Sequence, residues 1–199
     1  FKAWSDEIFS NIGEILFGTP SAESERAAQE MNAYFLQRIY DIRRHPKEHL
    51  LGQLVATETE DGKLDDEELL SFCRLLLIAG NETTTGLITA SARILNEEPD
   101  TLIQLKQNPQ LAKNFVEEAL RFYSPFSATA RRATKDVEIA GQAIAAGELV
   151  IPLLASANRD ERVFEAPDTF RLDRSSNPHL GLGFGIHVCL GAHLARLEG

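Results

Sequence analysis

Apolar residues recur three and four positions apart along the first half of the chain, and this spacing predicts a series of amphipathic helices. The first helix runs from Phe1 through Ile12 and Ile15 and is broken at Gly18-Thr19-Pro20. Pro46 ends the next helix, because the residue before a proline disfavours the helical conformation. The elements expected after the first helix are a helix over about Ala22 to Arg44, a short helix over about Leu50 to Ala56, and an acidic loop over Glu58 to Lys63.

Capping residues mark the start of a long helix over about 66–96. Asp65 occupies the N-cap position, and Glu68, three residues later, is its partner in a capping box. Leu64 and Leu69 flank this pair as a hydrophobic staple. Such a helix is longer than a small domain is wide, and both ends of the chain interrupt helical patterns. We therefore expect the chain to be a fragment of a larger fold.

The second half of the chain changes from helices to short strands. Helices are expected over about Pro99 to Gln107 and over about 111–123, separated by Asn108-Pro109. Over about 130–152, apolar positions alternate and glycines interrupt them, which predicts a small β region. Coil is expected from there to a glycine-rich stretch near the C-terminal end. The pattern predicts a mainly α fold with a small β region, in one partial domain over 1–199.

Charge and apolar content narrow the class of protein. The chain of 199 residues carries a formal net charge of −10, so it lacks the basic surface that nucleic-acid phosphates require. No apolar run reaches the roughly 18 residues of a membrane-spanning helix, and the first residues do not resemble a signal sequence. We expect a cytoplasmic protein with no nucleic acid or membrane as partner. Its two cysteines, Cys73 and Cys189, lie in unlike contexts and do not indicate a disulfide.

Cys189 ends a glycine-rich loop over about 181–191, and a helix starts directly after it. Glycines let backbone N–H groups approach a sulfur closely, and the N-terminus of a helix favours a thiolate. The alternative interpretation is a buried, unreactive cysteine in a loop. Four glycines around one cysteine favour a ligand or reactive thiolate.

The long helix contains an unusual polar interruption, Ala79-Gly80-Asn81-Glu82-Thr83-Thr84. Gly80 weakens the helix but leaves room for a cofactor against the backbone. The hydroxyl of Thr83 could bond the carbonyl four residues back, bend the helix and open a groove. The alternative is a partly solvated polar turn in a surface helix.

These segments resemble the haem-binding parts of the cytochrome P450 superfamily, of the soluble bacterial type. The cysteine loop followed by Leu194-Ala195-Arg196 resembles the family's haem-binding loop, and the polar interruption resembles its oxygen groove. Glu118-Ala119-Leu120-Arg121 stands between them, in the family's order. The resemblance covers about Leu64 to Arg196 and implies an incomplete cytochrome P450 fold, with the N-terminal part and the extreme C-terminus missing.

The resemblance implies that haem b is held by the thiolate of Cys189, the iron ligand. It also implies that His187 and Arg131 contact the haem propionates, with Arg132 as an alternative for the arginine. One position departs from the family's loop: Leu182 stands where a Phe is usual, which affects the surroundings of the thiolate. The glycines counted with the cofactor site are Gly80, Gly183, Gly185 and Gly191.

Two further sets of residues take their roles from the resemblance. Glu82 and Thr83 are expected to guide protons while dioxygen is activated. Glu118 and Arg121 are expected to form a buried triad with Arg174 that fixes the segment leading to the cysteine loop. The triad's role is structural rather than catalytic.

The activity implied is that of a haem-thiolate monooxygenase, which inserts one oxygen atom into a small organic substrate. Its electrons would come from a ferredoxin or similar redox partner with its reductase. One alternative is a peroxygenase, which would not need Glu82 and Thr83. Another is a non-catalytic P450-like fragment or partner subunit. A zinc site made from Cys189, His187 and His193 is a third, although this set lacks the pairing of structural zinc sites.

A few conspicuous residues are interpreted as structural. Cys73 is expected in the core, and Trp4 is expected to pack as an aromatic residue. His45 and His49 flank a helix break and are expected to be solvated.

Overall fold

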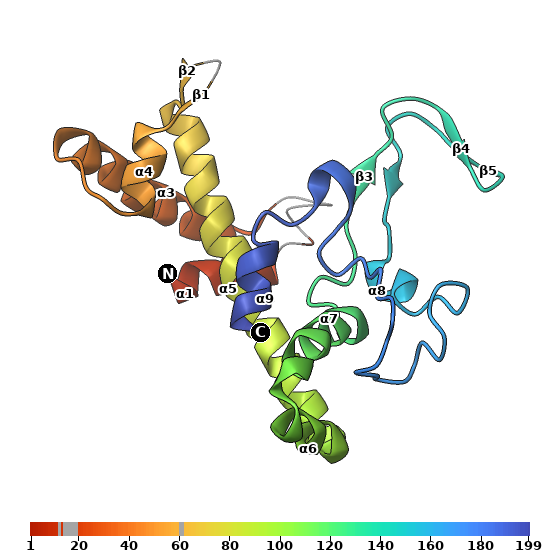
Figure 1. Cartoon of the computed structure of the whole chain (residues 1–199). Helices are drawn as coiled ribbons and strands as arrows, with labels where there is room; N and C mark the ends of the chain where they lie inside the picture. Colours follow the sequence, from red (N-terminus) through yellow and green to blue (C-terminus); the bar gives the residue numbers. More distant parts are fainter. Residues whose placement is uncertain (12, 14–19, 60–61) are drawn as a thin grey trace. The chain divides into compact units, whose positions relative to one another are not determined.

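The computed structural model describes residues 1–11, 13, 20–59 and 62–199, and helices dominate it (Figure 1). The α-helices are α1 (Lys2–Ser10), α3 (Ala22–Arg44), α4 (Leu50–Ala56), α5 (Asp66–Glu97), α6 (Pro99–Gln107), α7 (Ala112–Phe122), α8 (Leu154–Ala157) and α9 (Ala192–Glu198). The short 3-10 helices are η1 (Pro109–Leu111) and η2 (Gly185–His187). The strands are β1 (Glu58–Thr59), β2 (Gly62–Lys63), β3 (Arg131–Arg132), β4 (Val137–Ile139), β5 (Gln142–Ile144) and β6 (Leu149–Val150).

Most of the expected elements are present, with small differences at their ends. The helices predicted over Ala22–Arg44 and Leu50–Ala56 have these bounds in the structure. The acidic loop is instead an antiparallel hairpin of two-residue strands, in which Glu58 pairs with Lys63. Alternating polarity could not reveal strands this short. The predicted continuation of the first helix through Ile12 and Ile15 lies outside the described residues.

The chain divides into two compact units, Phe1–Glu82 and Thr83–Gly199, and the division falls inside α5. In the first unit α1 packs against α3 (Figure 1). Buried Ile8 of α1 and Met31 of α3 belong to one apolar cluster. Trp4 lies edge-on to Phe1, with ring centres 5.7 Å apart, so it packs as an aromatic residue as predicted.

The predicted capping box at the start of α5 is present. The Glu68 N–H donates to the Asp65 carboxylate over 2.8 Å, and the Asp65 N–H donates back to Glu68 over 2.9 Å. These bonds satisfy two backbone donors that the first turn of a helix leaves open. Leu69 is fully buried. The predicted contact between Leu69 and Leu64 stays a prediction.

Three other residues of the first unit lie where the sequence predicts. Cys73 is buried, and burial raises the pKa of its thiol. His45 and His49 are both exposed. The ring of His49 caps α4 by accepting the Gly52 N–H over 3.1 Å.

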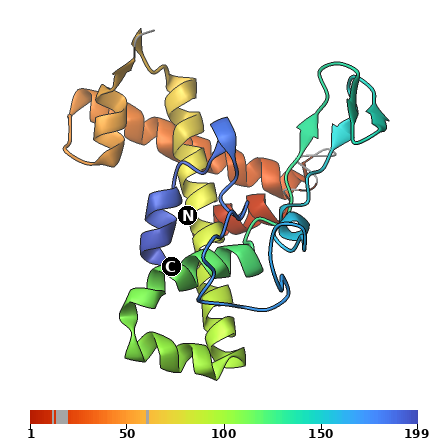
Figure 2. The same ribbon diagram turned by 45° about the vertical axis from the view of Figure 1, so that its right-hand side comes forward.

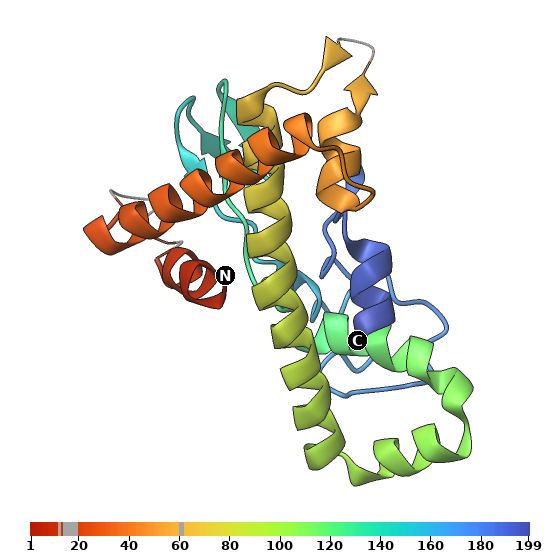
Figure 3. The ribbon, with the colours of Figure 1, turned by 90° about the vertical axis from the view of Figure 1, so that its left-hand side faces the viewer.

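The second unit is built on α7. Figure 3 shows the chain turning after α5 into α6 and then α7. One face of α7 is buried because its apolar residues recur at helical spacing, and α9 packs against the same helix (Figure 2). The core cluster of this unit consists of Leu87, Ile94, Phe115, Val116, Ala119, Leu120 and Leu172.

The β region of the second unit consists of two separate antiparallel pairs. β3 pairs with β6, so that Arg131 lies opposite Val150, and β4 pairs with β5. Ala140 and Gly141 join the latter pair with positive φ values of 52° and 80°, as the tight turn of a two-residue hairpin requires. In the part of the chain that the structure describes, no helix is long and apolar enough to cross a membrane.

Candidate functional site

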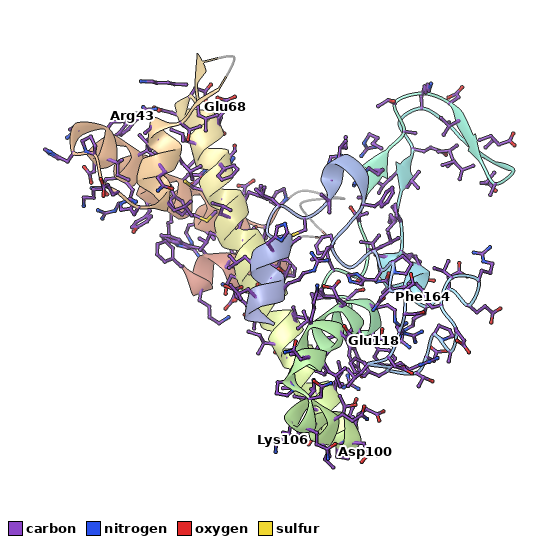
Figure 4. All side chains as sticks on the ribbon, in the orientation of Figure 1. Arg43, Glu68, Asp100, Lys106, Glu118 and Phe164 are labelled. Atoms are coloured by element: carbon purple, nitrogen blue, oxygen red, sulfur yellow. The ribbon has the colours of Figure 1, made fainter. Side chains whose placement is uncertain are left out.

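Glu118 of α7 lies in a buried network of charges, and Figure 4 labels it on the helix. Arg121, one helical turn later, donates to both oxygens of its carboxylate over 2.8 and 2.9 Å. Arg174 donates its Nε–H to the same carboxylate over 2.8 Å. The exposed fractions of the side chains are 1% for Glu118, 0% for Arg121 and 6% for Arg174. The structure therefore brings together the three residues of the predicted triad.

The remaining donors of both arginines are used by backbone carbonyls. Thr169 shares its carbonyl between Arg121 and Arg174, at 3.2 and 2.9 Å. Glu118 also accepts two further hydrogen bonds from the same stretch of coil. A buried charge is stable only with such a full set of partners, so the network fixes a segment with little regular structure. The other carbonyls bound are those of Asn158, Glu165, Ala166 and Pro167.

Asn158 connects this network to the cysteine loop, which we define as residues 181–191. Its side chain is completely buried. The amide nitrogen donates to Ser124 Oγ over 2.7 Å, and the amide oxygen accepts the N–H of Leu180 over 2.7 Å. No feature of the sequence singled out this residue, because an asparagine in coil is an ordinary turn residue.

The cysteine loop begins in direct contact with α7. A Cβ added to Gly181 would lie 2.6 Å from the carbonyl oxygen of Leu120, so only glycine fits there. Gly183 has a φ of +74°, and a Cβ there would meet the His187 carbonyl at 2.8 Å. The loop folds back on itself through a 2.8 Å hydrogen bond from the Cys189 N–H to the Leu182 carbonyl. These contacts explain why the loop requires glycine at positions 181 and 183.

The tip of the loop presents a thiol among exposed apolar side chains. Cys189 is a free cysteine and is exposed. Phe184 is 83% exposed, Ile186 95% and Leu190 69%. A cysteine thiolate can bind haem iron, and apolar side chains around it would suit the apolar porphyrin. The residues present therefore fit a haem held through Cys189.

Leu182, the departure from the family's loop, has two distinct contacts. Its side chain packs against the core cluster around α7. Its carbonyl accepts the Cys189 N–H, and any residue at this position could provide that bond. The substitution of Leu for the usual Phe therefore changes packing beneath the loop without removing the backbone bond.

A second cluster of charges involves Glu117, the residue before Glu118. His179 Nε2 lies 2.9 Å from Glu117 Oε2, and the guanidinium of Arg196 donates to both oxygens of the same carboxylate. Burial alone would raise the pKa of Glu117, but the bonds from Arg196 and His179 hold it below its ordinary value. The hydrogen bond to Glu117 raises the pKa of Arg196, and the charge of Cys189 acts in the same direction. None of these three residues was singled out from the sequence for such a role.

The two arginines considered for the propionates lie in β3, and both are exposed. Arg131 donates to Thr129 Oγ1 over 3.0 Å and to the Ala130 carbonyl over 2.7 Å. Arg132 donates to the Gly147 carbonyl over 2.7 Å. These contacts do not show which of the two arginines would bind a haem propionate. His187 lies in η2 and is exposed, like the arginines.

The predicted oxygen-groove residues lie in the middle of α5. Gly80 has open space beside it, since an added Cβ would meet no atom within 4 Å. Glu82 and Thr83 are partly buried. Hydrogen bonds from Lys2 and, less strongly, with Glu82 lower the pKa of Asp6.

Metal binding by a group of protein side chains finds no support in the described part of the chain. No three His, Cys, Asp or Glu residues come together there in a position to hold a metal ion. Cys189, His187 and His193, the residues of the zinc alternative, do not form such a group. Gly191, the last glycine of the set, precedes α9, with its added Cβ 3.9 Å from the Cys189 sulfur.

Sequence comparison identifies close relatives. The chain is 49% identical over 202 residues to "Cytochrome P450 109" from Bacillus spizizenii, covering 96% of the chain and 50% of the relative. It is 43% identical over 197 residues to "Biotin biosynthesis cytochrome P450" from Bacillus subtilis, covering 99% of the chain and 50% of the relative. The chain thus spans about half the length of the curated relatives it matches.

Solved structures agree with these relatives. P450BioI, crystallised in complex with acyl carrier protein ligated to hexadec-9Z-enoic acid, matches with a TM-score of 0.89 and 42% identity, over 99% of this chain and 51% of that chain. CYP109E1 from Bacillus megaterium, in complex with testosterone, matches with a TM-score of 0.86 and 39% identity, over 99% and 53%. The fold is thus a partial cytochrome P450 fold. Because the cytochrome P450 family model also matches residues 8–199, the chain belongs to the cytochrome P450 family.

Proposed function

We propose that this chain carries the haem-thiolate site of a monooxygenase that inserts one atom of dioxygen into a small organic substrate. Family membership implies a haem iron cofactor, and we assign it as haem b with the Cys189 thiolate as iron ligand. The haem supplies the activation of dioxygen. The observation that carries the proposal is the exposed thiol of Cys189 among apolar side chains on a loop anchored to α7.

The other residues of the site bind and orient the cofactor. Arg131 and His187 would pair with the propionates, because a guanidinium binds a carboxylate through two parallel hydrogen bonds. Gly183, Gly185 and Gly191 shape the loop, and the open space beside Gly80 leaves room for a flat group. The buried network of Glu118 keeps the segment before the loop in place.

Proton delivery is assigned to Glu82 and Thr83 of α5. A pocket closed to bulk water must supply protons through positioned carboxyl and hydroxyl groups. Their presence favours dioxygen over hydrogen peroxide as oxidant, and so a monooxygenase over a peroxygenase. Electrons would come from a ferredoxin or similar protein with its reductase. The relatives crystallised with an acyl chain and a steroid suggest an apolar organic substrate.

The test compares the two cysteines in the intact protein. Cys189→Ala should abolish both the red-shifted Soret band of the reduced carbonyl complex and product formation, because the thiolate is lost. Cys73→Ala should leave both nearly intact, since Cys73 is a buried core residue. Equal losses from the two substitutions would mean that Cys189 has no special ligand role. An unaltered protein without the thiolate band would instead support the non-catalytic alternative.

Thr83→Ala tests the proton route. Without the hydroxyl, dioxygen should still be reduced. After taking up two electrons and two protons, however, it should leave the site as hydrogen peroxide instead of oxidising the substrate. Product formed per NAD(P)H consumed should therefore fall several-fold while peroxide rises. The measurement is both yields under one reconstituted redox chain. Thr83→Ser, which keeps the hydroxyl, is the matched control, and an unchanged product yield in Thr83→Ala would remove the main support for proton delivery by this residue.

A further inference from the structure

The carboxylate of Glu117 joins two residues that stand on opposite sides of the cysteine loop in the sequence. His179 precedes the loop and Arg196 follows it, and both bind the same carboxylate. Glu117 itself belongs to α7, a helix whose neighbouring side chains are buried in the core. The side chain of His179 is only 3% exposed, compared with 22% for Glu117 and 38% for Arg196.

His179 also contacts the backbone of the loop entry. Its Nδ1 accepts the N–H of Gly181 over 3.1 Å, so Nδ1 is unprotonated and the ring proton lies on Nε2. The Nε2–H then donates to Glu117 over 2.9 Å. One imidazole therefore connects the carboxylate to Gly181, which lies directly against the Leu120 carbonyl.

The exit of the loop is connected to the same carboxylate over a short path. The carbonyl of Cys189 accepts the N–H of Ala192, the first residue of α9. Arg196, one turn later, reaches back from α9 to Glu117. Between these anchors the loop is also held by backbone bonds such as that from the Cys189 N–H to the Leu182 carbonyl, and by the packing of Leu182 against the core cluster.

We propose that Glu117 is a positioning residue that clamps both ends of the cysteine loop to α7, through His179 at the entry and Arg196 at the exit. Holding two ends of a short loop on one rigid helix restricts where its tip, and so the sulfur of Cys189, lies. The inference rests on the proposed function in one respect: the sulfur so positioned is the haem ligand. Exposed ion pairs often contribute little to stability, so the role to be tested is local order.

The first experiment measures amide hydrogen exchange in the intact protein with its haem. Glu117→Gln should accelerate exchange at Gly181 and Cys189 on the order of tenfold, because exchange reports local opening. The matched control is Glu97→Gln. Glu97 also accepts from an arginine and one other donor, Arg93 at 2.8 Å and the Tyr123 hydroxyl at 3.1 Å, but both partners are outside the loop.

Two outcomes of this experiment would overturn the clamp. If the amides of Gly181 and Cys189 exchange at the same rate in Glu117→Gln as in Glu97→Gln, the Glu117 cluster is an ordinary surface ion pair. If exchange accelerates equally throughout α7, Glu117 supports the fold as a whole and not the loop. Acceleration confined to the loop and its two ends supports the proposal.

A second variant separates the two interactions of His179, its bond to Glu117 and its bond to the Gly181 N–H. His179→Asn keeps a side-chain acceptor for the Gly181 N–H, since asparagine forms this turn readily, but it is too short to reach Glu117. Exchange at Gly181 should therefore accelerate as in Glu117→Gln, while exchange at Cys189 should change less, because Arg196 still holds the exit of the loop on Glu117. Wild-type exchange at both amides in His179→Asn would show that the link to Glu117 is dispensable at the entry, and the two-ended clamp would be wrong.

A spectroscopic readout connects the clamp to the cofactor. The reduced carbonyl complex of Glu117→Gln should lose its thiolate signature several-fold faster than that of Glu97→Gln, because the sulfur is less firmly held. Equal rates would contradict the positioning role. Absence of the thiolate signature from the unaltered protein would refute the proposed function instead, and the exchange data would still decide whether Glu117 orders the loop.

Discussion

Two consecutive glutamates of α7 lie in different surroundings. Glu118 is 1% exposed and faces two arginines whose other donors are also bound. Glu117 is 22% exposed, and its partner Arg196 is 38% exposed. Desolvation makes the first carboxylate intolerant of any lost partner, whereas water can replace part of what the second one loses. One helix thus carries a residue that supports the fold next to one that positions a loop.

The largest effect is expected from Glu118→Gln. The substitution removes the negative charge between two buried guanidinium groups, and leaving such charges uncompensated costs roughly 3–5 kcal/mol. The free energy of unfolding from urea titration should fall by this amount. Glu117→Gln is the control and should lower it by about 1 kcal/mol or less, because its ion pair is partly exposed. Similar losses for the two variants would contradict the distinction between them.

A smaller effect is expected from Asn158→Ala, which breaks the connection between the buried network and the cysteine loop. The substitution leaves the Leu180 N–H without its acceptor, at a cost of about 1–3 kcal/mol, and removes the bond that Ser124 accepts, although the Ser124 hydroxyl still donates to the Leu120 carbonyl. Urea titration gives the loss of stability, and exchange at Leu180 should become faster. The expectation fails if Leu180 exchanges at the wild-type rate, because the side chain would then not hold the loop entry.

The smallest effect is a pH dependence that belongs to Glu117. Its pKa in the folded protein is below the ordinary value of 4.5, so its charge stabilises the fold fully above that value. The contribution is lost as pH falls through the lowered pKa, because the unfolded chain takes up the proton first. The difference in unfolding free energy between wild type and Glu117→Gln should therefore be constant near neutral pH and shrink below pH 4.5. A difference that grew on acidification would contradict this sign.

Local patterns in the sequence accounted for much of the fold. The capping box of Asp65 and Glu68 and the helical spacing around Met31 involve residues close in the chain, so their interactions follow from position alone. The pair Glu118 and Arg121 is of the same kind, one turn apart on a helix. The resemblance to a known family added Arg174, which no spacing rule could have paired with Glu118.

By itself, then, the sequence determined the helices, the short β region, the glycine-rich surroundings of Cys189 and the family. Only the tertiary structure decided that Glu117 meets His179 and Arg196, which lie 62 and 79 positions further along the chain. It also decided that Asn158 holds Leu180 and that Gly181 lies against the Leu120 carbonyl. The physical reason is that these contacts depend on how α7 packs against coil and α9, and a pattern of polar and apolar residues records which face is buried but not which distant partner covers it.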